Sequence, residues 1–183
     1  MFNLDQFIED CQTAEKEGDA QQAVREVVAR AVSEPNAVLH SLGDPQKSEV
    51  KPLFKSDKLT ILNVLWAPKM TIAPHNHNMW AVIGMYTGRE DSILWRRLPN
   101  RDDGKLEAVG ARALGEKDAD ILGQDIVHSV TNPISRITGA IHVYGGDFYG
   151  IERSEWDPEL LTERPFDVEK NMRYFDELNA RLE

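Results

Sequence analysis

The pattern of apolar and polar residues divides the chain into two helical ends and a strand-rich middle. Residues 3–32 place apolar side chains three and four positions apart, which predicts two short helices separated at Gly18-Asp19. The same spacing returns near the C-terminus, where Asp167 is a predicted N-cap. The three apolar stripes are Leu4, Phe7, Ile8 and Cys11; Ala23, Val24, Val27, Val28 and Ala31; and Val168, Met172, Phe175, Leu178 and Leu182.

From residue 58 the pattern becomes that of β-strands. Short runs rich in β-branched and aromatic residues recur between turn residues, which predicts a sandwich or barrel. Residues 33–57 hold three prolines and Gly43, so an irregular connection is expected there. We therefore expect one domain, 1–183, with a helical and irregular extension (1–57), a β-barrel (58–150) and a C-terminal segment with a helix (151–183). The predicted strands are 59–66, 79–86, 93–98, 106–108, 120–122, 126–130 and 137–144.

Composition narrows the class of protein. With 183 residues, 41% of them hydrophobic and 28% charged, the chain has the make-up of a soluble globular domain. The net charge of −10 argues against nucleic acid or an anionic membrane as partner, although a local field can still attract an anionic small molecule. A single cysteine, Cys11, excludes an intramolecular disulfide, and the N-terminus lacks the pattern of a signal peptide. We expect a cytoplasmic protein.

Three of the five histidines have the spacing of a metal site. His75 and His77 form a His-x-His pair, which on a strand points both imidazoles to the same side. His128, from a later predicted strand, would complete a set of three ligands. Neutral imidazole ligates iron, zinc, copper and nickel, so the spacing predicts a metal site inside the barrel. The alternatives are an exposed His-x-His without function and a histidine buried in an ordinary core.

Two motifs around these histidines resemble those of the cupin superfamily. The run from Pro74 to Glu90, P-H-N-H-(x)6-G-(x)3-G-R-E, is similar to the first cupin motif, and Gly123 to Asn132, G-(x)4-H-(x)3-N, to the second. The resemblance covers roughly residues 50 to 157. It implies a mainly β protein, a double-stranded β-helix or jelly-roll barrel with a metal between its two sheets, here with helices added at both ends. Cupins commonly dimerise through their sheet edges, so the resemblance also allows a homodimer.

The ligand set resembles one group of cupins in particular. Many cupins add a glutamate four or five residues after the second histidine, where this chain has Ala81 and Val82. Glu90 lies beyond a glycine turn and is not counted as a ligand. Three histidines without a carboxylate are similar to the thiol dioxygenases, typified by cysteine dioxygenase, and to an uncharacterised bacterial branch of metal-dependent double-stranded β-helix proteins.

This resemblance implies an Fe(II) dioxygenase that oxidises a small thiol to a sulfinate with dioxygen. His142 and Tyr144 are similar to a His and Tyr pair behind the metal of these enzymes. By that analogy the Tyr144 hydroxyl lies near bound substrate or dioxygen, and His142 orients it through a hydrogen bond. The alternative is that both side chains simply face inward from a core strand.

The substrate stays open at this stage. Cysteine dioxygenase holds the substrate carboxylate with an arginine ahead of the first histidine, yet this chain has no arginine between Arg30 and Arg89. Arg89 and Arg96 are cations beyond the first motif, and we expect both on the surface. Imidazole also accepts zinc, nickel and other divalent metals. A non-oxygenase cupin, either a small-molecule binding or sensing module or a Zn or Ni Lewis-acid enzyme, is therefore the alternative function, and a metal-free structural cupin is a third.

Overall fold

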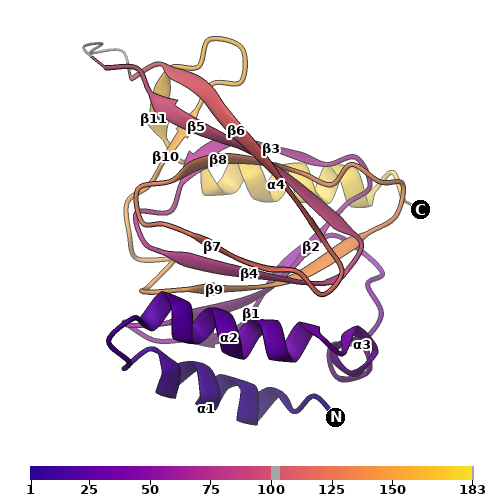
Figure 1. Cartoon of the computed structure of the whole chain (residues 1–183). Helices are drawn as coiled ribbons and strands as arrows, with labels where there is room; N and C mark the ends of the chain where they lie inside the picture. Colours follow the sequence, from indigo (N-terminus) through magenta and orange to yellow (C-terminus); the bar gives the residue numbers. More distant parts are fainter. Residues whose placement is uncertain (100–103, 183) are drawn as a thin grey trace.

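Two antiparallel sheets face each other in the computed structural model, which describes residues 1–99 and 104–182 (Figure 1). The first sheet has the strand order β1-β2-β9-β4-β7, and the second has the order β11-β10-β3-β8-β5-β6. The strands are β1 Glu49–Lys55, β2 Thr60–Trp66, β3 Thr71–Asn76, β4 Ala81–Thr87, β5 Arg89–Arg97, β6 Leu106–Gly115, β7 Ala119–Leu122, β8 Val127–Thr131, β9 Thr138–Tyr144, β10 Ser154–Trp156 and β11 Glu163–Pro165.

The pairing of eight of these strands is that of a jelly roll. β2 pairs with β9, β3 with β8, β4 with β7 and β5 with β6, all antiparallel. The chain from β2 to β9 is therefore one long hairpin whose two arms are wound together across both sheets. This topology confirms the predicted double-stranded β-helix, with helices added at both ends.

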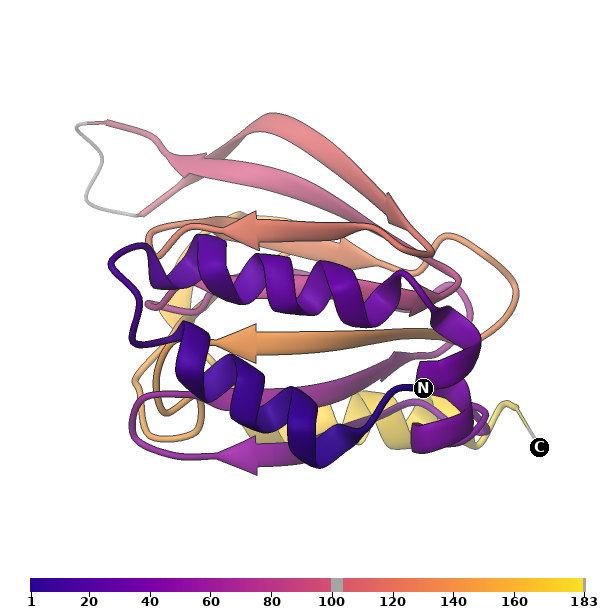
Figure 2. The ribbon, with the colours of Figure 1, turned by 60° about the horizontal axis from the view of Figure 1, so that its bottom comes forward.

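The three N-terminal helices cover the outer face of the first sheet, as the view from that side shows (Figure 2). β2, β4 and β9 are consequently buried on both faces over their whole length. In β2, Ile61 and Leu65 face the helices, whereas Leu62, Val64 and Trp66 face the barrel interior. The helices are α1 Leu4–Ala14, α2 Ala20–Val32, α3 Pro35–Leu42 and α4 Val168–Asn179.

Gly84 allows α2 to lie directly on β4. A Cβ at this position would come within 2.3 Å of Val28 Cγ1, closer than any carbon contact allows. The glycine of the first motif thus has a packing role on the helix side of the sheet. It does not face the barrel interior.

The expectation of an irregular connection over residues 33–57 was wrong in two places. Pro35 and Gly43, which suggested a loop, begin and end α3: proline is favoured at the first helical position, and Gly43 has φ +90° at the C-cap. β1 escaped prediction because it is an edge strand that contains Pro52 next to a register shift.

The C-terminal segment contains more structure than expected. β10 and β11 extend the second sheet, and neither was among the predicted strands. Asp167 caps α4 as predicted, by accepting a hydrogen bond from the Lys170 amide at 2.8 Å. Of the predicted apolar stripe only Phe175 is fully buried, whereas Val168 and Met172 remain 54% and 43% exposed. Within the described residues, no helix is both long and apolar enough to span a bilayer.

Candidate metal centre

The three predicted histidines converge inside the barrel. His75 and His128 lie directly opposite each other in the β3–β8 ladder, which brings their side chains to the same face. His77 follows the end of β3. Its Nε2 atom lies 3.2 Å from Nε2 of His75 and 3.3 Å from Nε2 of His128. All three side chains are buried, and their ring nitrogens form one cluster within 4.8 Å.

The nitrogen atoms that face each other are oriented as metal ligands would be. His75 Nδ1 donates to the Ala73 carbonyl at 2.9 Å, which leaves the Nε2 lone pair free. His128 Nδ1 lies 3.3 Å from the Ser92 hydroxyl. Ligands about 2.1 Å from one ion are about 3 Å apart when adjacent, close to the spacing of these atoms. The Nδ1 partners of His75 and His128 are of the kind that fix metal-bound imidazoles, whereas Nδ1 of His77 is buried without a partner among the described residues.

Burial keeps the three imidazoles neutral. It lowers the pKa of His75 to about 4 and the pKa values of His77 and His128 well below their usual range. A neutral imidazole presents a lone pair to a cation and is the form that binds metal. No carboxylate belongs to the cluster in the described parts of the chain, so the structure offers three nitrogen ligands and could hold one divalent ion.

His142 and Tyr144 lie on β9 and face the same interior. The Tyr144 hydroxyl is 3.1 Å from His142 Nδ1, and the Tyr144 ring meets the His77 ring edge-on at 5.1 Å between centroids. The hydrogen bond expected between the two side chains is therefore present. Burial raises the pKa of Tyr144, so its hydroxyl stays protonated.

Glu90 completes a polar chain behind Tyr144. It reaches across the barrel from β5, is 1% exposed, and accepts a hydrogen bond from Trp66 Nε1 at 2.8 Å. Its Oε2 atom is 3.5 Å from His142 Nε2, an ion-pair distance without hydrogen-bond geometry. Glu90 is not in the metal cluster, as expected, but sequence reasoning missed its place beside His142.

A cavity of about 250 Å³ adjoins the histidines. Its polar lining consists of His75, His77, His142, Tyr144, Arg153 and Asn171. The rest is apolar and comes from the barrel, from the segment after β9 and from α4: Val50, Leu62, Val64, Trp66, Ile72, Phe148, Tyr149, Phe166, Val168, Met172 and Phe175. A small molecule in this cavity would lie against both the metal ligands and the Tyr144 hydroxyl.

Arg153 is the cation of this cavity, and no motif in the sequence pointed to it. It lies between β9 and β10, downstream of both motifs. Arg89 and Arg96, by contrast, lie on the surface as expected, 51% and 67% exposed in ion pairs with Asp91 and Glu107.

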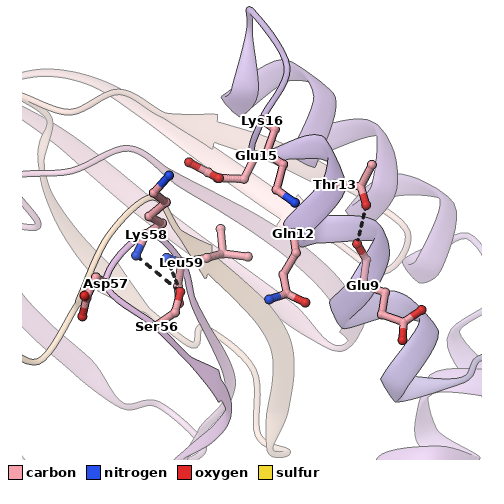
Figure 3. A pocket seen from close by; sticks show the side chains of 9 residues that line it. All are labelled: Glu9, Gln12, Thr13, Glu15, Lys16, Ser56, Asp57, Lys58 and Leu59. Carbon is pink, nitrogen blue, oxygen red and sulfur yellow. Dashed lines mark hydrogen bonds between the residues drawn. The ribbon is translucent and has the colours of Figure 1, made fainter.

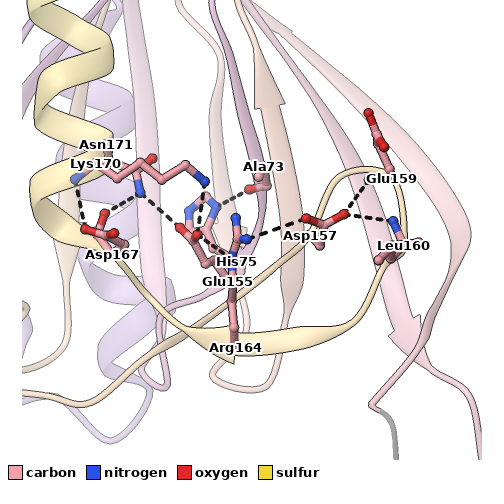
Figure 4. Close-up of polar contacts among 10 residues, drawn as sticks. All are labelled: Ala73, His75, Glu155, Asp157, Glu159, Leu160, Arg164, Asp167, Lys170 and Asn171. Carbon is pink, nitrogen blue, oxygen red and sulfur yellow. Dashed lines mark hydrogen bonds and ion pairs between the residues drawn. The ribbon is translucent and has the colours of Figure 1, made fainter.

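A buried carboxylate attaches α4 to the barrel wall next to the site (Figure 4). Glu155, opposite His75 in the β10–β3 pairing, is 2% exposed. It accepts hydrogen bonds from Arg164 Nε at 2.8 Å and Asn171 Nδ2 at 3.0 Å, and Lys170 Nζ lies 3.5 Å away. Since Asn171 and Phe175 of α4 line the cavity, this contact also sets the cavity's size.

A second hollow, of about 580 Å³, lies between α1 and the β1–β2 turn (Figure 3). It is lined mainly by polar side chains such as Glu9, Gln12 and Lys16, and Ser56 binds the backbone of its own turn. It brings together no group of metal ligands among the residues described. Among the described residues, the group that could hold a metal ion is the histidine cluster in the barrel.

No family model matches the chain. Its fold is similar to that of an RmlC-like cupin family protein from Methanocaldococcus jannaschii, at 13% identity and a TM-score of 0.46, over 57% of this chain and 85% of that one. A protein with a double-stranded β-helix domain from Klebsiella pneumoniae subsp. pneumoniae has 12% sequence identity and a TM-score of 0.48, over 64% of this chain and 87% of that one. Oxalate decarboxylase from Bacillus subtilis has 16% sequence identity and a TM-score of 0.41, over 52% of this chain and 22% of that one. Such values assign neither reaction nor substrate to this chain.

Proposed function

We propose that this protein is an Fe(II)-dependent dioxygenase that converts a small thiol into a sulfinate. The observation that carries the proposal is the Tyr144 hydroxyl, held by His142 beside three converging imidazoles at one end of an apolar cavity. A core with only a structural role would have no reason to bury three neutral nitrogen lone pairs facing one another.

The residues fit a metal with positions left for reactants. His75, His77 and His128 would hold the ion through Nε2 and occupy one face of an octahedral site. Bound iron would supply acidification of the thiol and activation of dioxygen. The overall reaction, RSH + O₂ → RSO₂H, is balanced without a further reductant: sulfur loses four electrons, dioxygen gains four, and both oxygen atoms end on sulfur.

The chain's own groups would orient the reactants. A protonated Tyr144 would accept a hydrogen bond at the substrate, and His142 limits the rotation of its hydroxyl. Glu90, near His142 Nε2, favours the imidazole tautomer with the proton on that atom. Nδ1 then accepts from the Tyr144 hydroxyl, whose oxygen lone pairs face the cavity. The apolar lining excludes water from the reacting sulfur.

The direct test measures dioxygen consumption by protein loaded with Fe(II) under anaerobic conditions. Cysteine, cysteamine, 2-mercaptoethanol and 3-mercaptopropionate serve as the thiol panel, and mass spectrometry identifies the sulfinate. We expect thiol-dependent uptake that His77→Ala abolishes and His40→Gln, a change on exposed α3, leaves intact. Absence of stimulation by every thiol would sink the proposal.

Three nitrogen ligands also suit a zinc site, which keeps a non-oxygenase cupin as the alternative. Metal analysis of protein purified without added metal separates the two. Bound zinc in tetrahedral geometry, with no turnover after iron loading, would favour a Lewis-acid enzyme or a binding module.

A further inference from the structure

Arg153 has a charge that nothing in the described structure neutralises. Its guanidinium lies between two aromatic rings, with Cζ 4.0 Å from the Phe148 centroid and 4.5 Å from the Phe166 centroid. Its Nε atom is buried and has no hydrogen-bond partner within residues 1–99 and 104–182. Surface arginines differ, since Arg89 and Arg97 each lie against a carboxylate.

This arrangement is costly unless an anion completes it. Burial lowers the pKa of Arg153, the direction expected when a cation leaves water. Contact with aromatic faces returns only part of the lost hydration, about 0.5–2 kcal/mol per ring in general. A guanidinium stays protonated in proteins, so the side chain cannot relieve the cost by losing its charge. An anionic group that enters the cavity would supply the missing hydrogen-bond acceptor.

The two rings that enclose Arg153 also touch the metal centre. Phe166 lies 5.8 Å from the His75 ring, and Phe148 lies 6.2 Å from the His77 ring and 4.2 Å from the Tyr144 ring, between centroids. Arg153 and the two rings line the same cavity as His75 and His77. A single small molecule can approach both, with its anionic end at Arg153 and its other end at the histidines.

We propose that the cavity binds a small carboxylate with an apolar body, and that Arg153 holds the carboxylate group. As a statement about substrate this rests on the proposed function, which it narrows to thiols that also carry a carboxylate. The guanidinium fork, including Nε–H, matches the two oxygens of a carboxylate. A phosphate dianion fits less well, because Arg153 is the only Lys or Arg in the described lining.

The test titrates the purified protein with acetate, benzoate, 3-phenylpropionate and the corresponding amides by calorimetry. Each carboxylate and its amide have nearly the same shape and differ in charge. Metal-free and zinc-loaded protein are both used, so that binding at the metal is separated from binding at Arg153. We expect at least one carboxylate to bind roughly 10–100-fold more tightly than its amide in both forms.

Arg153→Gln should remove this preference by weakening the carboxylate and leaving the amide within about twofold. Arg153→Lys, which keeps the charge but loses Nε–H and the planar fork, should give an intermediate affinity and decides the matter if the glutamine variant does not fold. Arg96→Gln is the matched control, since it removes one positive charge from an exposed site. Equal affinity for carboxylate and amide in the wild type, an unchanged preference in both Arg153 variants, or tighter binding of inorganic phosphate would each overturn the proposal.

Failure of this proposal and failure of the thiol dioxygenase proposal are distinguishable. Carboxylate preference in metal-free protein does not depend on the metal or the reaction. If the preference is present but no thiol stimulates oxygen uptake, the anion site stands and the reaction is wrong. If uptake occurs, Arg153→Gln should raise KM for 3-mercaptopropionate roughly 10-fold or more, with little change in kcat and little change in either constant for 2-mercaptoethanol.

Discussion

At the scale of single residues, the site contains three histidine nitrogens that could bind a metal cation and one arginine, Arg153, that has no anionic partner among the described residues. Nε2 of His77 lies 3.2 Å from Nε2 of His75 and 3.3 Å from Nε2 of His128, and the described residues place no other side chain in hydrogen-bond contact with these atoms. Such a cluster is stabilised by a metal ion, which accepts all three lone pairs at once.

Replacing His77 by alanine should abolish metal retention. His77 lies between the other two histidines, with its Nε2 atom close to both of theirs. Its loss leaves two ligands and lowers the affinity for the metal ion far below that of the wild type. Differential scanning fluorimetry should show that added Zn²⁺ or Fe²⁺ raises Tm of the wild type, by the mass-action stabilisation expected for a native-state ligand, about 2.7 kcal/mol at 100 times Kd. His40→Gln should respond as the wild type does. A metal-dependent Tm shift that survives in His77→Ala would contradict the assignment.

Glu90 should decide which nitrogen of His142 carries the proton. In the wild type a carboxylate near Nε2 favours protonation there, whereas Glu90→Gln can turn its amide NH₂ toward Nε2 and move the proton to Nδ1. Long-range ¹H–¹⁵N spectra of zinc-loaded protein would report the tautomer directly. We expect the two ¹⁵N shifts of His142 to exchange character in Glu90→Gln, with metal content unchanged. Glu107→Gln, on the surface, is the control.

The histidines could be predicted from the sequence, but Glu90 and Arg153 could not. His77 comes two positions after His75, directly beyond the end of β3, so the closeness of the two side chains is a local property. Glu90 contacts Trp66 and His142, which are 24 and 52 residues away in the sequence, only because the two sheets pack face to face. Arg153 lies in an irregular segment, where no periodicity predicts the direction of a side chain.

At the scale of elements, α4 is held against the barrel by apolar contacts and by the hydrogen bonds of two polar side chains, Asn171 and Asn179. Phe175 packs against Trp66 with ring centroids 5.8 Å apart, while Val168 and Met172 of the same helix stay half exposed. The apolar stripe alone therefore buries little surface. Asn171 donates to Glu155, and Asn179 accepts hydrogen bonds from the Ser48 amide and hydroxyl and donates to the Ser48 carbonyl. Helical spacing could not predict these contacts, because Glu155 and Ser48 lie in other parts of the chain.

Glu155→Gln should loosen α4 without unfolding the barrel. Replacement of the buried carboxylate removes the counter-charge of Arg164 and Lys170, and we expect a loss of about 1–3 kcal/mol in the free energy that holds α4 in place. Hydrogen–deuterium exchange should show faster exchange of amides in α4 and unchanged exchange in β2, β4 and β9. Glu169→Gln, at a 90% exposed side chain of the same helix, should leave exchange unchanged. Equal protection of α4 in both variants would show that the Phe175 packing and the Asn179–Ser48 hydrogen bonds suffice.

Strands were missed where their formation depends on pairing with distant parts of the chain and not on the local sequence pattern. β1 is an edge strand whose exposed Lys51 and Lys55 hide its pairing with β2, and β10 is three residues long. The central strands β2, β4 and β9 were predictable because helices on one side and the barrel interior on the other make them apolar throughout.

At the scale of the whole molecule, the buried histidines link stability to pH. In an unfolded chain each imidazole has a pKa of about 6.5. In the folded protein burial lowers the pKa of His75 to about 4 and lowers those of His77 and His128 further from their usual range. Below about pH 6.5 the unfolded state therefore binds more protons than the folded state, and the free energy of unfolding falls as the pH decreases.

This linkage predicts a loss of stability in a defined pH window. A single group with the pKa of His75 should lower the free energy of unfolding of the metal-free protein by about 2 kcal/mol between pH 7 and pH 5. The surface carboxylates whose pKa values are lowered, such as Asp157, lose their contribution only at lower pH, so the window between pH 6.5 and 5 isolates the histidines. Urea unfolding at pH 7.5, 6.5, 5.5 and 5.0 measures the effect. The triple variant H75Q/H77Q/H128Q should show a much flatter dependence, because it lacks the three buried imidazoles that must be protonated. Bound metal should shift the loss of stability to lower pH, since protons must then displace the ion. A wild-type pH dependence as flat as that of the triple variant would contradict the burial of three neutral imidazoles.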